Sequence, residues 1–132
     1  MDLINRIASL IRIPRSTARI SDEVKAALEK ATIEKDSGRY TQALHILDEI
    51  IADDPDIPLA LYIKAVILWE GFKDSYTAML GLQRVKELVP KKKDKLNRMA
   101  TELMEKIESS YLRRMNGTAD NGSNQSPSQS GR

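Results

Sequence analysis

A frame of four residues that occurs twice, 35 positions apart, most constrains how this 132-residue chain can fold. In each copy a small residue is followed by large apolar residues four and seven positions later, and by a proline after twelve. The two copies are Ala43/Leu47/Ile50/Pro55 and Ala78/Leu82/Val85/Pro90. Such spacings put side chains on one face of an α-helix, and a proline pushes the preceding residue out of the helical region. The sequence therefore predicts a repeated amphipathic helix.

A second pattern precedes the first and has the same period. The small residues Ala31, Ala65 and Ala100 are 34 and 35 positions apart. A large-x2-large-small-x2-large pattern is complete in Leu96/Met99/Ala100/Leu103, broken by Lys64 in Leu61/Lys64/Ala65/Leu68, and weak around Ala31. Together the two patterns resemble the tetratricopeptide repeat (TPR), a helix-turn-helix of 34 residues. The resemblance covers roughly residues 22–112, or about two and a half repeats.

The resemblance implies an all-α fold, a right-handed α-α superhelix of TPR-like helical hairpins. We expect three parts: an N-terminal amphipathic helix and linker over residues 1–20, the repeat domain over 21–115, and a disordered tail over 116–132. The predicted helices of the repeat domain run from Ser21 to about Ser37, Tyr40 to Asp53, Asp56 to Glu70, Ser75 to Val89, and Pro90 to about Met115. The last one is long and is expected to cap the stack.

The ends of these helices follow from local sequence signals. Ser21 and Ser75 are expected to be N-caps, Asp56 is expected to cap the third helix, and residues 71–74 are expected to form an inter-helix turn. The third helix is apolar on nearly every side. We therefore expect it to be the central helix of the domain, or to present one face to a ligand.

The first thirteen residues form an amphipathic pattern that has three interpretations. The apolar stripe is Leu3, Ile4, Ile7, Leu10 and Ile11, and Pro14 ends it. This helix caps the repeats, lies in a membrane interface, or belongs to a mitochondrial targeting segment. Charge also favours a fourth interpretation, in which residues 3–11 of the same chain, or of a neighbouring chain by self-association, occupy the peptide groove described below. Residues 1–21 carry four arginines and one aspartate, whereas residues 22–57 carry ten acidic and four basic side chains, a net of −6.

The residues that enzymes and metal sites require are scarce. The chain has no cysteine and a single histidine, His45, which we place on the solvated side of its helix. Residues 53–56 lack the alternating acids, glycine and terminal glutamate of a calcium loop, so we interpret them as capping residues. We expect no enzyme, no catalytic residue, no cofactor and no metal. Aromatic residues make up 5% of the chain, and basic residues such as Lys91–Lys93 lack aromatic neighbours, so no nucleic-acid partner is expected.

The TPR resemblance also implies where a ligand binds. In that family the first helices of successive repeats line a concave groove that holds an extended peptide or a helix. By register, the lining would be Leu28, Thr32, Leu59, Tyr62, Val66, Trp69, Asn97, Thr101 and Met104. Our predicted peptide-binding residues are Leu59, Tyr62, Val66, Trp69, Asn97, Arg98 and Thr101, with Tyr62 and Trp69 as the strongest candidates because each has a large apolar body and a polar tip.

Family members that bind acidic chaperone tails use a clamp of Lys, Asn and Arg side chains. The corresponding positions here are Leu28, Thr32, Ile63, Asp94 and Arg98. Since Arg98 alone matches the clamp, we expect an apolar or amphipathic peptide rather than a chaperone tail. The predicted function is a cytoplasmic, non-enzymatic adaptor or scaffold that binds a protein or peptide partner. The alternative is a peripheral membrane protein recruited by its N-terminal helix.

Overall fold

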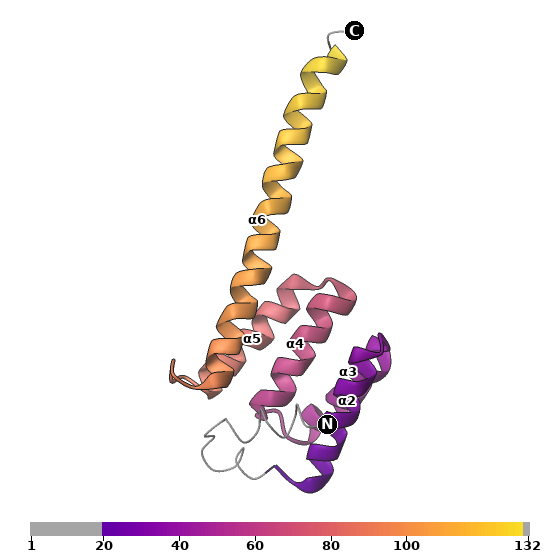
Figure 1. Cartoon of the computed structure of the whole chain (residues 1–132), viewed down its shortest axis with the longest axis vertical. Helices are drawn as coiled ribbons and strands as arrows, with labels where there is room; N and C mark the ends of the chain where they lie inside the picture. Colours follow the sequence, from indigo (N-terminus) through magenta and orange to yellow (C-terminus); the bar gives the residue numbers. More distant parts are fainter. Residues whose placement is uncertain (1–19, 131–132) are drawn as a thin grey trace.

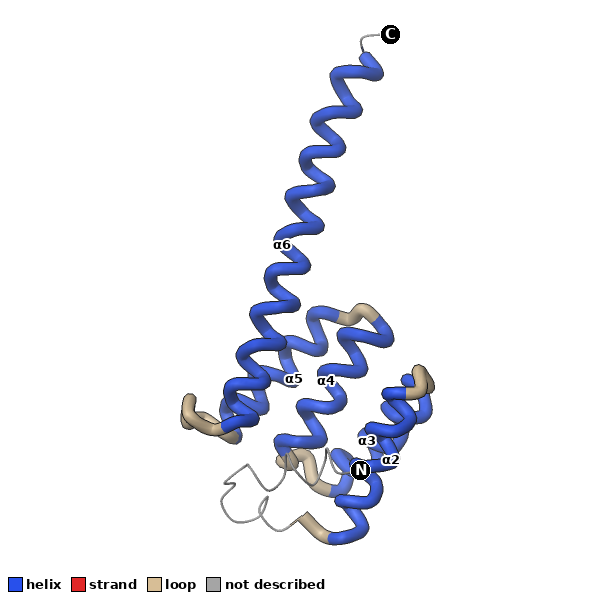
Figure 2. The backbone as a smooth tube through the Cα atoms, in the orientation of Figure 1, coloured by secondary structure: helices blue, strands red, loops and turns tan. Residues whose placement is uncertain are grey.

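The computed structural model describes residues 20–130, and this part of the chain is entirely helical. Its helices are α2 (Asp22–Asp36), α3 (Tyr40–Asp53), α4 (Pro58–Phe72), α5 (Ser75–Leu88) and α6 (Lys95–Ser130) (Figures 1 and 2). No strand occurs between residues 20 and 130, so the all-α prediction is confirmed for this range. The N-terminal helix predicted over residues 1–13 lies outside the described residues.

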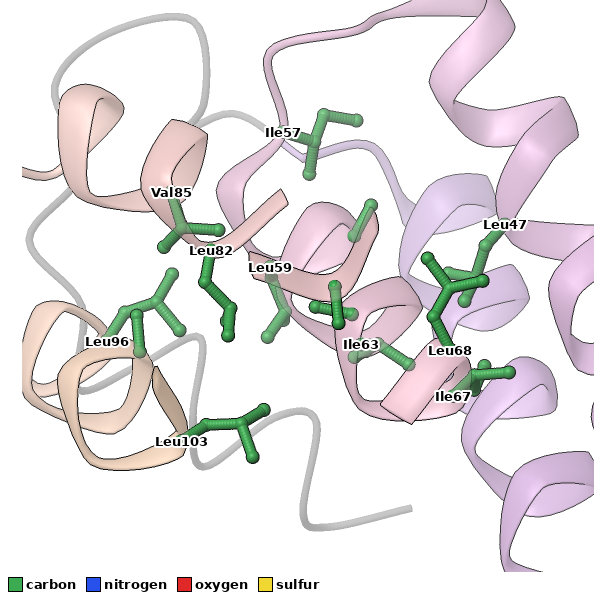
Figure 3. Packing of buried hydrophobic residues seen from close by; sticks show 14 of the residues in the cluster. Leu47, Ile57, Leu59, Ile63, Ile67, Leu68, Leu82, Val85, Leu96 and Leu103 are labelled. Carbon is green, nitrogen blue, oxygen red and sulfur yellow. The ribbon is translucent and has the colours of Figure 1, made fainter. Parts of the chain in front are cut away.

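Helix α4 lies in the middle of the fold. Each helix packs against the next one along the chain, and α4 also contacts α2 and α6, so it touches all four other described helices. In Figure 3, Leu68 of α4 lies toward Leu47 of α3, and Leu59 of α4 lies toward Leu82 of α5. Most of its apolar side chains are buried, including Leu59, Ile63 and Ile67. The prediction of a central helix is therefore confirmed.

The repeated frame forms equivalent parts of the core. Ala43 and Leu47 of α3 and Ala78 and Leu82 of α5 have no exposed surface. The small residues of the second pattern, Ala31, Ala65 and Ala100, are also buried, one each on α2, α4 and α6. Small side chains allow neighbouring helix backbones to approach closely, and each fully buried large apolar side chain contributes about 1.5–3 kcal/mol. The same residue types therefore perform the same packing role in successive helix pairs.

The helix starts partly agree with the sequence signals. Ser21 is the N-cap of α2, because its Oγ accepts a hydrogen bond from the Val24 N–H at 3.1 Å. The prediction for Asp56 is wrong, because Ile57 occupies the N-cap position of α4 and Pro58 its first turn. Asp74, rather than Ser75, caps α5, and its Oδ1 accepts from the Thr77 N–H at 3.1 Å.

The predicted turn at residues 71–74 is shorter in the structure, because α4 extends to Phe72. Lys73 ends the helix with a left-handed backbone (φ 56°), and the Asp74 N–H donates to the Leu68 carbonyl at 2.8 Å. Gly71 lies inside the last turn, directly against the ring of Tyr40 at the start of α3. This glycine leaves room for the aromatic ring rather than breaking the helix.

The last helix differs from its predicted boundaries at both ends. Residues 91–93 precede α6, which begins at Lys95. Helix α6 then continues to Ser130, whereas the sequence predicts an end near Met115 and a disordered tail over residues 116–132. Its distal part extends away from the other helices (Figure 1), so no packing determines where it ends. Gly117, a residue type that favours a helix end, lies within the helix, where a glycine costs about 1 kcal/mol relative to alanine.

Two glycines allow a matched test of this packing. A Cβ at Gly81 would lie 3.7 Å from the Ala65 Cβ, an ordinary contact, whereas a Cβ at Gly71 would overlap the Tyr40 ring, at 2.7 Å from Cδ1 and Cδ2. We expect Gly81→Ala to raise the free energy of unfolding by about 0.5–1 kcal/mol because it lowers the entropy of the unfolded chain. Gly71→Ala should lower it by about 1–3 kcal/mol through overpacking.

Urea unfolding followed by circular dichroism measures both changes. Equal stabilisation by the two substitutions would contradict the contact between Tyr40 and the α4 backbone.

Candidate peptide-binding face on helix α4

One side of α4 carries three large side chains that the rest of the described chain covers only in part. Tyr62, Val66 and Trp69, spaced by four and three residues, share this side and are half-buried. They pack against the edge of the core. Leu59 lies on the same side one turn earlier but is buried, as are Ile63 and Ile67 further round the helix. We call the surface formed by Tyr62, Val66 and Trp69 the α4 face. It is a partly exposed apolar surface on the central helix.

Helix α6 contributes residues next to this face. Met104 is half-buried against the core. Thr101 is also half-buried, and its Oγ1 donates a hydrogen bond to the Asn97 carbonyl at 3.0 Å. Glu102 lies near enough to Tyr62 to affect its titration. Through Glu102, helix α6 therefore places an acidic side chain near the α4 face.

Four of the positions expected to line a groove belong to the core instead. Leu59 is 1% exposed and Asn97 is 3% exposed, although Asn97 also borders the open pocket on α6 described below. The Asn97 Nδ2 donates to the Val89 carbonyl at 2.7 Å and thereby joins the start of α6 to the end of α5. On α2, Leu28 and Thr32 are buried, and the Thr32 Oγ1 donates to the Leu28 carbonyl at 3.0 Å. In this structure these four predicted lining residues contribute to the packing of the helices.

Arg98 lies on an exposed side of α6. Its guanidinium is exposed and donates to the Lys93 carbonyl. It lines an open pocket of about 390 Å³ together with Thr101, Glu102 and two lysines, Lys86 and Lys92. Sequence reasoning missed Lys86, which lies in the last turn of α5, because it considered lining residues from the first helix of each repeat alone.

Burial raises the pKa of Tyr62 above its ordinary value of 10.0, and the nearby carboxylates of Glu102 and Glu70 raise it further. Both effects disfavour the phenolate, since burial penalises a charge and like charges repel. The Tyr62 hydroxyl, which is protonated at neutral pH as in any tyrosine, therefore keeps its proton further into the alkaline range. The α4 face thus combines an apolar surface with a neutral donor in acidic surroundings.

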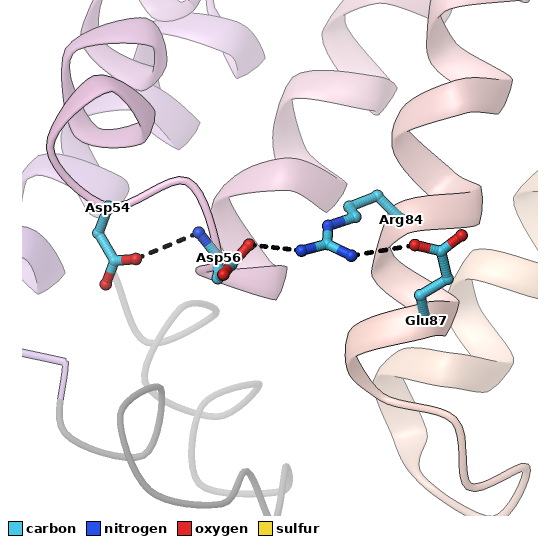
Figure 4. A network of polar contacts seen from close by, with 4 residues as sticks. All are labelled: Asp54, Asp56, Arg84 and Glu87. Atoms are coloured by element: carbon cyan, nitrogen blue, oxygen red, sulfur yellow. Dashed lines mark hydrogen bonds and ion pairs between the residues drawn. The ribbon is translucent and has the colours of Figure 1, made fainter.

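The acidic residues between α3 and α4 have a structural role. The Asp54 Oδ1 accepts from the Asp56 N–H at 3.1 Å, and the Asp56 Oδ1 accepts from the Arg84 guanidinium at 2.8 Å (Figure 4). Glu87 accepts a second bond from Arg84 at 3.0 Å, and both carboxylates raise the pKa of Arg84. This exposed network connects the α3–α4 loop to α5.

Possible metal ligands are dispersed over the helices that the structure describes. No group of three or more His, Asp or Glu side chains between residues 20 and 116 is placed to hold a metal ion. The side chain of His45 is exposed and lies 3.1 Å from a carboxylate oxygen of Glu49. The prediction that His45 lies on a solvated surface is therefore confirmed.

Comparison of this chain with protein-family models, with curated proteins and with solved structures gives no match in any of the three. Among the described helices, none is both long and apolar enough to cross a membrane.

The titration of Tyr62 predicts how stability depends on alkaline pH. Because its pKa is higher in the folded chain, the folded state holds its proton more tightly than the unfolded state. This contribution to the free energy of unfolding is fully present below the unfolded pKa of about 10 and is lost as the pH rises through the folded pKa. We expect Tyr62→Phe to remove this part of the alkaline destabilisation.

The measurement is urea unfolding between neutral and alkaline pH, with Tyr76→Phe as the matched control, because Tyr76 is exposed. If Tyr62→Phe and Tyr76→Phe showed the same pH dependence as the wild type, burial of the Tyr62 hydroxyl would be contradicted.

Proposed function

We propose that this chain is a non-enzymatic adaptor of the TPR type that binds an apolar or amphipathic segment of a partner protein. In this proposal α2 with α3 and α4 with α5 are two helical hairpins of a right-handed superhelix, and α6 is a half repeat that caps them. Two observations support it. The repeated frame occupies equivalent core positions on α3 and α5, and the first helices of successive pairs, α2, α4 and α6, are neighbours through α4.

The observation that carries the functional proposal is that Tyr62, Val66 and Trp69, three large side chains on one side of a helix with many buried residues, are only half-buried. Aromatic residues of this kind dominate binding energy at protein interfaces, because they bury a large apolar area and have a polar group at the tip. Tyr62 and Trp69 are separated by seven residues, or about 10.5 Å along the helix axis. A partner helix with apolar residues at positions i, i+3, i+4 and i+7 matches that length.

The surroundings of the face set the chemistry of the partner. Glu70 and Glu102 lie near Tyr62, so basic residues beside the partner's apolar stripe are favoured over acidic ones. Burial of one large side chain contributes about 1.5–3 kcal/mol, and association has to offset the loss of translational and rotational freedom. A small face of three large residues therefore implies modest affinity.

A cytoplasmic location remains our prediction.

The proposal is tested with a displayed library of amphipathic helical peptides selected on the wild-type chain. We expect the selected peptides to lose binding to Trp69→Ala, because this truncation removes the largest apolar side chain of the face. Tyr76→Ala is the matched control, since Tyr76 is an exposed aromatic on α5 that lies outside the face. Trp69 is the single tryptophan of the chain, so its fluorescence reports binding directly.

Peptides that bind Trp69→Ala as tightly as the wild type, without changing Trp69 fluorescence in the wild type, would contradict the proposed face. Circular dichroism of Trp69→Ala establishes that loss of binding does not reflect loss of fold.

A further inference from the structure

A second surface lies at the other side of the fold, where the described chain begins. It is an open pocket of about 390 Å³ formed by the first turns of α2, the second half of α3 and the start of α4. It shares no residue with the α4 face. Its apolar lining consists of Ile20, Val24, Ala27, Ile46, Ile50 and Ile57.

Four carboxylates accompany this apolar lining. Glu23, Glu49, Asp53 and Asp54 all contribute to the pocket. Glu49 pairs with His45, whereas the ion pairs found among the described residues involve none of the other three. Helix α3 ends at this pocket, whereas α2 and α4 begin at it, so their dipoles partly offset one another and the four carboxylates set the charge of the pocket. The pocket therefore favours an occupant that is apolar on one side and cationic on the other.

We propose that this pocket binds the N-terminal segment of the same chain, residues 3–11. The segment has an apolar stripe of Leu3, Ile4, Ile7, Leu10 and Ile11 that matches the apolar lining. Arg6 and Arg12 lie outside that stripe, and the first 21 residues carry four arginines against one aspartate. Such a segment buries its stripe in the pocket and directs its arginines to the carboxylates.

The position of the pocket makes an intramolecular occupant geometrically accessible. Ile20 and Ser21 line it themselves, so the preceding chain starts at the pocket wall. A helix over residues 3–11 is about 13.5 Å long. The connecting residues 12–19 can span at most about 26–29 Å when extended, enough to turn the segment back over the pocket. Attachment to the same chain also gives an effective concentration in the millimolar range, which favours this occupant over a second copy in dilute solution.

A segment bound in the pocket would cover the apolar residues at the start of α2. Helix α2 is the first described helix. Ile20, just before it, and Val24, in its first turn, are only half-buried by the described chain. Terminal units of helical stacks need a covering element with a polar outer side. The docked segment supplies that element and leaves the α4 face open.

Engineered disulfides in the full chain test the proposal, since the natural sequence has no cysteine. Ile46→Cys in the pocket is combined with Ile7→Cys or Ile11→Cys on the apolar stripe. The matched controls combine it with Asn5→Cys or Ser9→Cys on the polar side of the segment. A disulfide requires the two Cβ atoms to approach within about 3.5–4.5 Å. We expect the stripe pairs to form an intramolecular disulfide several-fold faster than the control pairs.

Each other outcome overturns the proposal. Equal rates for stripe and control pairs mean that the segment does not dock through its apolar side. A covalent dimer means that a second copy occupies the pocket. Absence of any disulfide, together with flotation of the full chain on phosphatidylserine vesicles, assigns the segment to a lipid surface. Val24→Cys replaces Ile46→Cys if circular dichroism shows that the latter variant has lost helix.

Discussion

The burial of α4 is the constraint on which the rest of the described fold depends. A helix with apolar residues on nearly every side is unfavourable in water unless neighbours cover it. Here α3 and α5 cover it along most of its length, and α2 and α6 contact it as well. Its one basic residue, Lys64, keeps its ammonium group at the surface, 2.8 Å from a carboxylate oxygen of Asp48 on α3. The ion pair between Lys64 and Asp48 therefore connects α3 to α4 at the surface.

The incomplete coverage of the same helix explains the proposed site. Helices α2 and α6 contact α4 less extensively than α3 and α5 do, so Tyr62, Val66 and Trp69 stay half-buried between them. Their positions are held by a well-packed helix, which limits the entropy lost on binding. The N-terminal pocket has a different origin, because it lies at the free end of the first helix pair. The two surfaces thus arise at separate places for separate physical reasons.

The elements whose sequence signals are periodic could be predicted well. The helix over Tyr40–Asp53 matches the structure at both ends, and the frame residues Leu47 and Leu82 are buried as the repeat requires. Caps were less predictable, because Asp74 and Ser75 are adjacent and both are good N-cap residues, and the Asp74 carboxylate is the one that accepts from the Thr77 N–H. The role of Gly71 depends on Tyr40, which is distant in sequence. Likewise, register alone does not reveal that Asn97 donates its amide to the Val89 carbonyl.

Native-state hydrogen exchange tests most directly the claim that α4 organises the fold. Amides in the interior of α4, such as those of Ile63 and Ile67, should exchange only through global unfolding, with a free energy equal to that from urea denaturation. Amides of α2 and α6 should exchange at lower free energies, since these helices lie at the ends of the stack. If α4 instead exchanged by local opening while α2 and α3 stayed protected, the central role of its burial would be contradicted.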